Sequence, residues 1–338
     1  MSERYKKQAL FIGGTGQEKL KQAHVLVIGA GALGSASSEM LARAGVGHLT
    51  IVDRDYVERS NLQRQQLYTE KDAAEKLPKA IAAKNRLREI NSEIMVEAIV
   101  GDVNAQNIEE LCRNKSVIVD GTDNFETRLI VNDAAIKYDI PFVFGACVAS
   151  YGLTFPIIPG RTPCLHCLMD HLPTQGMTCD TVGVISPIVQ LVASYQVTHV
   201  LQLVTGADFS PVLQSFDIWK GESSQIKIEA LKNKHCPTCG LDANFPYLSF
   251  DNQQKTDVLC GRDAVQLRPG AKQQAQEMAL DSLAESIKGV AGEVVANPYL
   301  LAFTFEGHRI VFFRDGRAIV HGTNDPIRAR AIYNKIIS

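Results

Sequence analysis

The fold of this chain follows from residues 24–53, which read HVLVIGAGALGSASSEMLARAGVGHLTIVD. Residues 24–29 form a short apolar run with β-branched side chains that ends at a glycine, and this pattern predicts a strand. Residues 32–45 have the apolar spacing of a helix, and residues 48–53 predict a second strand. A strand-helix-strand unit of this kind implies two neighbouring parallel strands.

The same alternation continues towards the carboxyl terminus. The pattern predicts helices at 78–91, 107–112 and 126–138, and strands at 94–100, 116–123 and 140–146. Strands that alternate with helices at this spacing are typical of a doubly wound, Rossmann-like α/β sheet, which we expect over about residues 20–147.

The pattern changes after residue 147. We expect a strand pair within 148–163, a long buried helix at 185–205 and two strands within 212–231, which would extend the sheet with antiparallel members. Beyond residue 246, a strand, a helix, a hairpin and a last helix restart the pattern. The sequence therefore predicts a core domain at 1–247 and a small α+β domain at 248–338.

Composition narrows the class of protein. The 338 residues suffice for about two domains, and 45% hydrophobic with 21% charged residues is typical of a globular protein. A net charge of -2 gives no bulk attraction for nucleic acid or a membrane surface. The longest apolar stretch, residues 182–205, carries polar side chains such as Gln190 and His199, and the amino terminus lacks a signal core. We therefore expect a cytoplasmic protein.

The glycine motif at the end of the first strand indicates a nucleotide. Gly29 permits a tight turn, Gly31 lets a phosphate approach the backbone, and Gly34 allows close packing of the helix. Asp53, at the end of the next strand, is placed to accept a ribose hydroxyl. The alternative is a glycine turn that only packs.

Charged residues downstream favour ATP over a dinucleotide. The run 60–65 (SNLQRQ) contains Arg64, Lys79 starts a helix, and Asp123 follows a strand together with Asp120. Two cations and two carboxylates at the carboxyl edge of the sheet suit a triphosphate with its magnesium, with Asp123 as the candidate ligand and Asp120 as a second candidate. Each charge alone could be a solvated surface residue, and a nicotinamide-dependent oxidoreductase is the alternative that leaves these charges without a role.

Two Cys-x-x-Cys pairs predict a zinc site. Two thiolates separated by two residues can bind one face of a tetrahedral ion, and the two pairs together complete a four-sulfur shell. The eight cysteines of the chain are too few for a disulfide scaffold, although two local disulfides are the alternative here. The predicted ligands are Cys164, Cys167, Cys236 and Cys239.

Four motifs, GAGALGS (29–35), DRDYVERSNLQRQ (53–65), LPKA (77–80) and DGTDNFETR (120–128), resemble the ThiF/MoeB/HesA family, bacterial relatives of ubiquitin-activating enzymes. The similarity spans about residues 4–247. It implies an enzyme that uses MgATP to adenylate the C-terminal glycine of a small ubiquitin-like sulfur carrier ending in Gly-Gly. The candidate nucleotide-binding residues are Gly29, Gly31, Ala32, Gly34, Asp53, Ser60, Asn61, Leu62, Gln63, Arg64, Lys79, Asp123 and Asn124.

The resemblance also implies roles for two residues outside these motifs. Cys179 lies in a polar segment that matches the family's loop cysteine, which links covalently to the carrier, although a free loop thiol is the alternative. In the family's Arg-Tyr-x-Arg-Gln run, the second Arg reaches the phosphates bound by the partner subunit. This chain has Lys7 there, which keeps the charge without the planar fork, so that Arg4 could share the role.

The expected protein is thus a homodimeric, zinc-stabilised adenylyltransferase that activates a thiamine-pathway carrier, with sulfur supplied by a donor such as a cysteine desulfurase. The molybdopterin-synthase carrier is the alternative substrate. A nucleotide-binding scaffold without chemistry is the alternative of another class. For residues 248–338, docking of the carrier or of the sulfur donor is a hypothesis.

Overall fold

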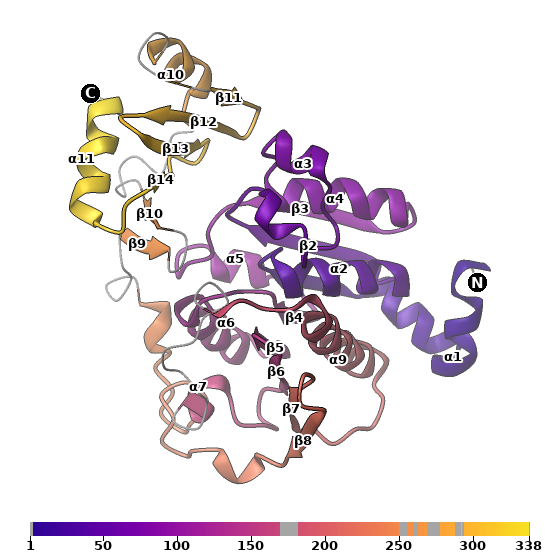
Figure 1. The fold of residues 1–338 in the computed structure, drawn as a ribbon. Helices are drawn as coiled ribbons and strands as arrows, with labels where there is room; N and C mark the ends of the chain where they lie inside the picture. The colour runs from indigo at the N-terminus through magenta and orange to yellow at the C-terminus, as the bar shows by residue number, and fades with distance from the viewer. Residues whose placement is uncertain are drawn as a thin grey trace. The chain divides into compact units, whose positions relative to one another are not determined.

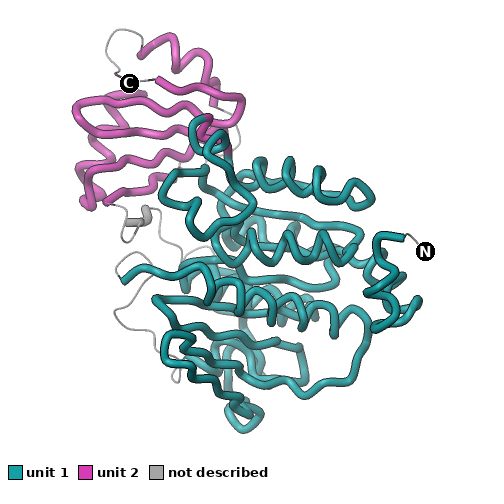
Figure 2. The backbone as a smooth tube through the Cα atoms, turned by 45° about the vertical axis from the view of Figure 1, so that its right-hand side comes forward, with its two compact units in different colours: residues 1–74, 78–252 teal, residues 75–77, 253–338 magenta. Residues whose placement is uncertain are grey.

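The computed structural model describes residues 3–169, 182–249, 256–259, 263–268, 278–287, 292 and 294–337, with 256–259 as backbone only. The chain forms two compact units (Figure 2). The first comprises residues 1–74 and 78–252, and the second comprises residues 75–77 and 253–338. No helix of the described residues has the length and apolar character needed to span a membrane.

An eight-stranded mixed sheet organises the first unit (Figure 1). Its strand order is β3-β2-β1-β4-β5-β6-β7-β8. Neighbours from β3 to β5 are parallel, whereas those from β5 to β8 are antiparallel. The strands are β1 (His24–Ile28), β2 (His48–Asp53), β3 (Met95–Val100), β4 (Val117–Asp120), β5 (Phe142–Val148), β6 (Tyr151–Ile157), β7 (Leu213–Asp217) and β8 (Glu222–Ile226).

Helices cover both faces of this sheet. Apolar side chains of α5 and α6 share one buried cluster with β1, β4 and β5, while α2 and α9 form another cluster. The helices are α1 (Lys6–Gln22), α2 (Ala32–Ala44), α3 (Glu70–Ala74), α4 (Lys79–Ile90), α5 (Ile108–Cys112), α6 (Phe125–Lys137), α7 (Leu165–Leu168) and α9 (Ser186–Thr205). The predicted doubly wound sheet with an antiparallel extension is confirmed.

The second unit has its own six-stranded antiparallel sheet, in the order β11-β12-β13-β14-β10-β9. Side chains of α10 and α11 pack with alternate residues of its strands, including Phe303 and Phe312, in a separate buried cluster. The elements are β9 (Thr256–Leu259), β10 (Ala264–Leu267), α10 (Leu280–Ser286), β11 (Val295–Ala296), β12 (Leu300–Phe305), β13 (His308–Phe313), β14 (Ala318–His321) and α11 (Pro326–Ile337).

Helix α1 and the segment 148–163 differ from the sequence-based expectation. Helix α1 was not predicted, because its glycines disfavour a helix, and it is kinked at Gly13, where φ is 78°. Gln8 and Gln17 fix it to the first unit, since both amides donate to the carbonyl of Ala44 at the end of α2, at 2.7 and 3.0 Å. The strand pair expected within 148–163 is a single strand, β6, that pairs with β5.

Candidate functional site

The glycine turn between β1 and α2 is closed by contacts between backbone atoms. Gly29 has a φ of +86°, which favours glycine, and a Cβ there would lie 2.4 Å from the carbonyl oxygen of Gly121. A Cβ on Gly34 would lie 1.8 Å from the carbonyl oxygen of Gly29. The turn therefore interlocks with the loop that follows β4, and neither position tolerates a side chain.

Gly31 differs from these two glycines because a Cβ there would make only ordinary van der Waals contacts. Its φ is −72°, and a Cβ would meet only Gly121 O at 3.8 Å and Gln65 Nε2 at 3.9 Å. Gly31 is the N-cap of α2 and supplies no side-chain cap to the first-turn amides. Backbone without a side chain at the amino end of a helix suits a phosphate, since the amides and the helix dipole favour negative charge.

Asp53 ends β2 next to this turn and is held by backbone amides. Its carboxylate accepts hydrogen bonds from the amides of Ala30 (2.5 Å) and Asp55 (2.7 Å). Burial raises the pKa of Asp53, while the nearby Lys79 ammonium opposes this shift. Each carboxylate oxygen retains a second lone pair, so the fixed carboxylate can still accept a hydroxyl.

Lys79 is almost fully buried at the start of α4. Its Nζ donates to Oδ2 of Asp55 at 3.1 Å, and its side chain is 3% exposed. Sequence reasoning assigned a role to Lys79 and Asp53 but missed Asp55. The signal was the Asp-Arg-Asp order of residues 53–55, in which both carboxylates come to lie near Lys79.

The run 60–63 shapes a short turn beside these residues. The Asn61 side chain accepts from the amide of Glu58 at 3.1 Å and thereby helps to cap the 3-10 helix Arg59–Asn61. Ser60 and Gln63 are exposed, Leu62 is half-buried, and Gln63 Nε2 donates to the carbonyl of Val184 at 3.4 Å.

Arg64 follows directly and is half-buried. Its Nη1 donates to the carbonyl of Ser60 at 3.0 Å, so the guanidinium is held against its own turn. A planar group with five N–H donors retains capacity for an anion in this arrangement.

The loop after β4 carries the remaining candidates. Asp123 is exposed, and Asn124 Nδ2 lies 3.4 Å from its Oδ1. Asn124 is also the N-cap of α6, because its Oδ1 accepts from the amide of Thr127 at 2.8 Å. Asp120 is buried and paired with Arg128, Nε to Oδ2 at 2.9 Å, which the sequence did not indicate.

Parallel strands bring these groups to one edge. Ile28, Asp53 and Asp120 end the adjacent parallel strands β1, β2 and β4, so the loops that follow these strands share the carboxyl edge of the sheet. The strand order reverses direction between β1 and β4, and ligands of open α/β sheets bind at such a switch point.

Lys7 and Arg4 precede β1 in the chain and are not part of this edge. Lys7 is exposed on α1, while Arg4 donates to the carbonyl of Ile90 at 2.9 Å and pairs with Glu93 at 3.3 Å. Cys179 lies outside the described residues.

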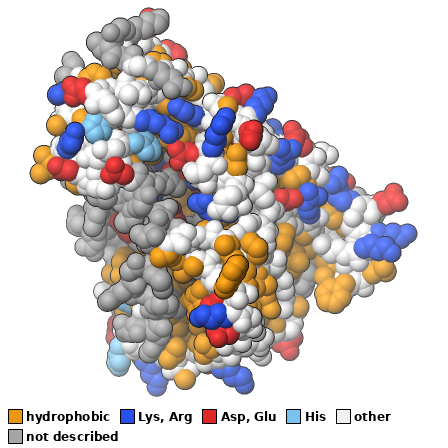
Figure 3. Space-filling view, viewed as in Figure 1, with side chains coloured by type: hydrophobic (Ala, Val, Ile, Leu, Met, Phe, Trp, Pro, Cys, Tyr) orange, Lys and Arg blue, Asp and Glu red, His pale blue; other side chains and the backbone are white. Residues whose placement is uncertain are grey.

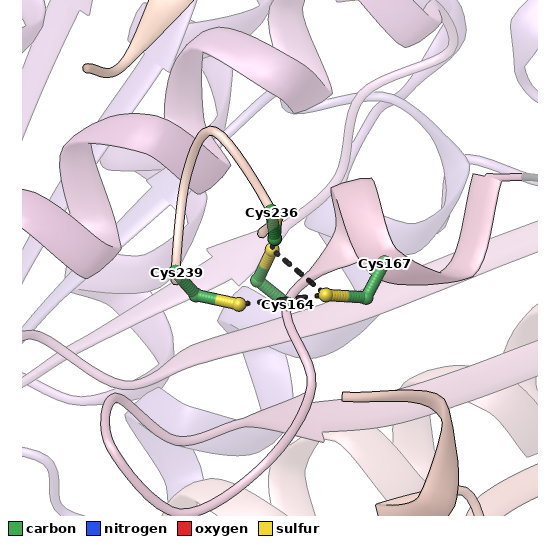
Figure 4. A group of neighbouring side chains, drawn as sticks. All are labelled: Cys164, Cys167, Cys236 and Cys239. Atoms are coloured by element: carbon green, nitrogen blue, oxygen red, sulfur yellow. Dashed lines mark hydrogen bonds between the residues drawn. The ribbon is translucent and has the colours of Figure 1, made fainter. Parts of the chain in front are cut away.

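The four predicted zinc ligands converge (Figure 4). Their sulfurs all lie within 4.8 Å of one another, with separations of 4.0 Å for Cys164–Cys167, 3.6 Å for Cys164–Cys236 and 3.4 Å for Cys167–Cys239. A tetrahedral ion with Zn–S bonds of about 2.3 Å requires sulfurs about 3.8 Å apart. Hydrogen bonding between Cys164 and Cys167 lowers the pKa of the Cys167 thiol and raises that of Cys164, because the neighbouring sulfurs share their protons.

Helix α6 holds both cysteine pairs in place. Asn132 Oδ1 accepts from the amide of Leu165 at 2.8 Å, next to Cys164. Asp133 accepts from Thr238 Oγ1 at 2.6 Å, inside the second pair, and burial raises the pKa of this carboxyl. The donor set, its spacing and this support fit a structural zinc ion.

A second group of potential ligands, His24, His48 and Glu97, lies on β1, β2 and β3. The two imidazoles are stacked, with ring centroids 3.6 Å apart and planes 10° from parallel. Lone pairs of parallel rings point alongside each other and do not converge on one ion. Burial lowers the pKa of His24 to about 4 and also lowers that of His48, so both rings are neutral at pH 7.

Comparison with known proteins agrees with this geometry. The ThiF family matches residues 5–238. The chain is 57% identical over 339 residues to the sulfur carrier protein ThiS adenylyltransferase of Bacillus subtilis, with both chains covered completely. It is 32% identical over 242 residues to the molybdopterin-synthase adenylyltransferase of Salmonella typhimurium, covering 70% of this chain and 96% of the relative.

Solved structures show the same fold. The crystal structure of E. coli MccB with AMPCPP and MccA matches with a TM-score of 0.62 at 22% identity, over 71% of this chain and 75% of MccB. The curated relatives are named adenylyltransferases, which agrees with the predicted class of enzyme. The chain therefore belongs to the ThiF family, as the motifs in residues 29–35, 53–65, 77–80 and 120–128 implied.

Proposed function

We propose that this protein uses MgATP to adenylate the C-terminal glycine carboxylate of a ThiS-like sulfur carrier in thiamine biosynthesis. The observation that carries the proposal is the 57% identity over complete lengths with a ThiS adenylyltransferase, which includes the second unit. The carboxyl edge of the sheet supplies chemistry that suits this reaction. The same reaction on the molybdopterin-synthase carrier is the second candidate, because relatives with that name match at 31 to 32% identity.

The reaction needs charge neutralisation and alignment of the reactants. A carboxylate oxygen of the carrier attacks the α-phosphorus of ATP, the bond to the β-phosphate oxygen breaks, and pyrophosphate leaves. No general base takes part, because the attacking carboxylate is already ionised at pH 7. The protein's task is to hold two anions together in line.

We assign the nucleotide to the carboxyl edge. The phosphates would meet the open backbone at Gly31 and the first turn of α2, with Asp53 on the ribose and Ser60 to Gln63 and Asn124 beside them. Arg64 and Lys79 would neutralise phosphate charge. The Lys79 ammonium has three donor protons, and Asp55 accepts one of them.

We assign the magnesium ion to Asp123. This residue is exposed at the edge, whereas both carboxylate oxygens of Asp120 already accept hydrogen bonds from Thr122 and Arg128. A magnesium ion held by Asp123 would offset the negative charge of the phosphates.

We further propose a homodimer. Figure 3 shows hydrophobic side chains over α9 and at α1. On α1, Leu10 is 78% exposed and Phe11 is 92% exposed, a few residues from Lys7. A partner covering this face would bring Lys7 to the second subunit, in the role that the family gives to an arginine. We propose that zinc at the four cysteines is structural. Cys179 would form the covalent link to the carrier. Reduced thiols suit the cytoplasm, where we expect the protein to act.

The deciding experiment is carrier-dependent exchange of labelled pyrophosphate into ATP, run in parallel with a thiamine carrier and a molybdopterin carrier. We expect exchange with the thiamine carrier and its loss in Asp123→Ala. Cys179→Ala should keep exchange but lose a covalent carrier adduct. Tight ATP binding without exchange for either carrier would instead support a non-catalytic scaffold.

The second unit, residues 253–338 with 75–77, enters as a proposal of its own: it docks the carrier or the sulfur donor, for example a cysteine desulfurase. Deletion of residues 248–338 should then weaken carrier or donor binding. Unchanged affinity for both would exclude this role.

A further inference from the structure

The loop of residues 121–124 joins β4 to α6 and carries Asp123. It is locked to the glycine turn, because the amide of Gly121 donates to the carbonyl of Ile28 at 2.8 Å and a Cβ on Gly121 would lie 2.4 Å from Gly29 O. The position of Asp123 relative to the phosphate end of the site therefore depends on what holds this loop.

Two buried charged side chains, Asp120 and Arg128, hold the donor groups and the carbonyl of Thr122 in this loop. Asp120 Oδ1 accepts from the Thr122 amide at 2.9 Å and from its Oγ1 at 2.7 Å. Arg128 Nη2 donates to the carbonyl of Thr122 at 2.8 Å and to that of Gly145 at 3.0 Å. Arg128 Nε also donates to Asp120 Oδ2 at 2.9 Å, which links the two charged side chains directly.

The surroundings of Arg128 fix its guanidinium. Its side chain is 7% exposed and that of Asp120 is 0% exposed. The guanidinium carbon lies 5.3 Å from the ring centroids of both Phe125 and Phe144. A lysine would keep the charge, but a single ammonium cannot reproduce the planar fork that reaches Asp120, Thr122 and Gly145 together.

We propose that Arg128 is a positioning residue for the metal: acting through Asp120 and Thr122, it sets the loop that presents Asp123 to the magnesium of MgATP. It also neutralises Asp120, so that this carboxylate does not compete with Asp123 for the ion. The inference rests on the proposed function, in which Asp123 is the magnesium ligand. Residues that orient a metal ligand typically change metal affinity by about 10- to 100-fold when they are replaced.

The test is a titration of the full-length protein and ATP with Mn²⁺, read as free Mn²⁺ by electron paramagnetic resonance. Arg128→Lys should weaken Mn²⁺ binding about tenfold. In the exchange assay, it should raise the half-saturating Mg²⁺ concentration by a similar factor, with the rate recovering at saturating Mg²⁺. Arg317→Lys is the matched control, because Arg317 is 4% exposed and paired with Asp315 in the second unit, and it should change neither value.

Thr122→Val keeps the shape of the side chain but replaces the hydroxyl that donates a hydrogen bond to Asp120 with a methyl group. It should therefore also weaken Mn²⁺ binding. It decides the matter if Arg128→Lys does not fold. Asp123→Asn separates the two levels of the argument. If Asp123→Asn leaves Mn²⁺ affinity unchanged, the metal assignment of the proposed function fails. If Asp123→Asn weakens binding while folded Arg128→Lys and Thr122→Val do not, the positioning role of Arg128 is wrong.

Discussion

Two glycines of the turn after β1 should respond differently to the same added methyl group. In Gly34→Ala the Cβ would lie 1.8 Å from Gly29 O, and real Cβ atoms essentially never approach closer than 3.0 Å. The backbone would have to separate by about 1.2 Å, and a misplacement of about 1 Å can lower the rate of a catalysed step about 100-fold. Overpacking of this kind destabilises by about 3 kcal/mol, so we expect both folding and ATP binding to suffer.

Gly31→Ala should separate these two effects. Its Cβ would have only ordinary contacts, at 3.8 Å and 3.9 Å, so the free energy of unfolding should change by less than about 0.5 kcal/mol. The methyl group would nevertheless occupy the space through which a phosphate approaches the first turn of α2. We expect ATP affinity to fall at least about tenfold, equivalent to about 1.4 kcal/mol.

Urea denaturation and calorimetric titration with MgATP measure the two quantities. Gly101→Ala is the control for the methyl group itself, since its nearest neighbour would be Ile99 Cγ2 at 3.9 Å, and it should change neither. Wild-type ATP affinity in Gly31→Ala would refute the phosphate site at this turn. Wild-type stability in Gly34→Ala would refute the interlocked turn.

Three further predictions concern other parts of the first unit. The purified protein should contain one zinc ion per chain by elemental analysis, and zinc-free wild type would contradict the site. Cys239→Ser should lose the zinc ion and unfold at a lower temperature, whereas Cys112→Ser should keep the ion. Asp55→Asn should destabilise the protein by about 3 kcal/mol in urea, because it removes the carboxylate that pairs with the buried Lys79 ammonium, and an unchanged midpoint would argue against this pair as the charge balance. Burial lowers the pKa of His24 to about 4, whereas the pKa of this side chain in the unfolded chain is near 6.5. As the pH falls, the unfolded chain therefore takes up the proton first. The contribution of neutral His24 to the free energy of unfolding is present above pH 6.5 and is lost as the pH falls to 4. His24→Gln should flatten the pH dependence of the urea midpoint over this range, and an unaltered slope would assign it to other groups.

Local patterns in the sequence were sufficient for the fold class and for the clustering of the four cysteines. The strand-glycine-helix order of residues 24–53 dictates a parallel unit, because the turn needs glycine at Gly29 and Gly34 and both positions are visible in the sequence. The cysteine pairs predict their cluster because two residues between thiolates suit one face of a tetrahedral ion. Helix α1 was missed, because its glycines disfavour a helix and because the amides of Gln8 and Gln17 that hold it bind a carbonyl at the end of α2.

The sequence by itself placed Asp53, Lys79, Asp120 and Asp123 at one edge, since each lies at or near a strand end or helix start. Only the tertiary structure decided how their charges are used. It pairs Lys79 with Asp55 and Asp120 with Arg128, and it leaves Asp123 exposed. Burial and pairing depend on which groups distant elements bring within about 3 Å, and a buried charge is stable only when such a partner is present. Neighbours in sequence do not reveal those partners, so only the fold shows which carboxylates are paired and which is exposed.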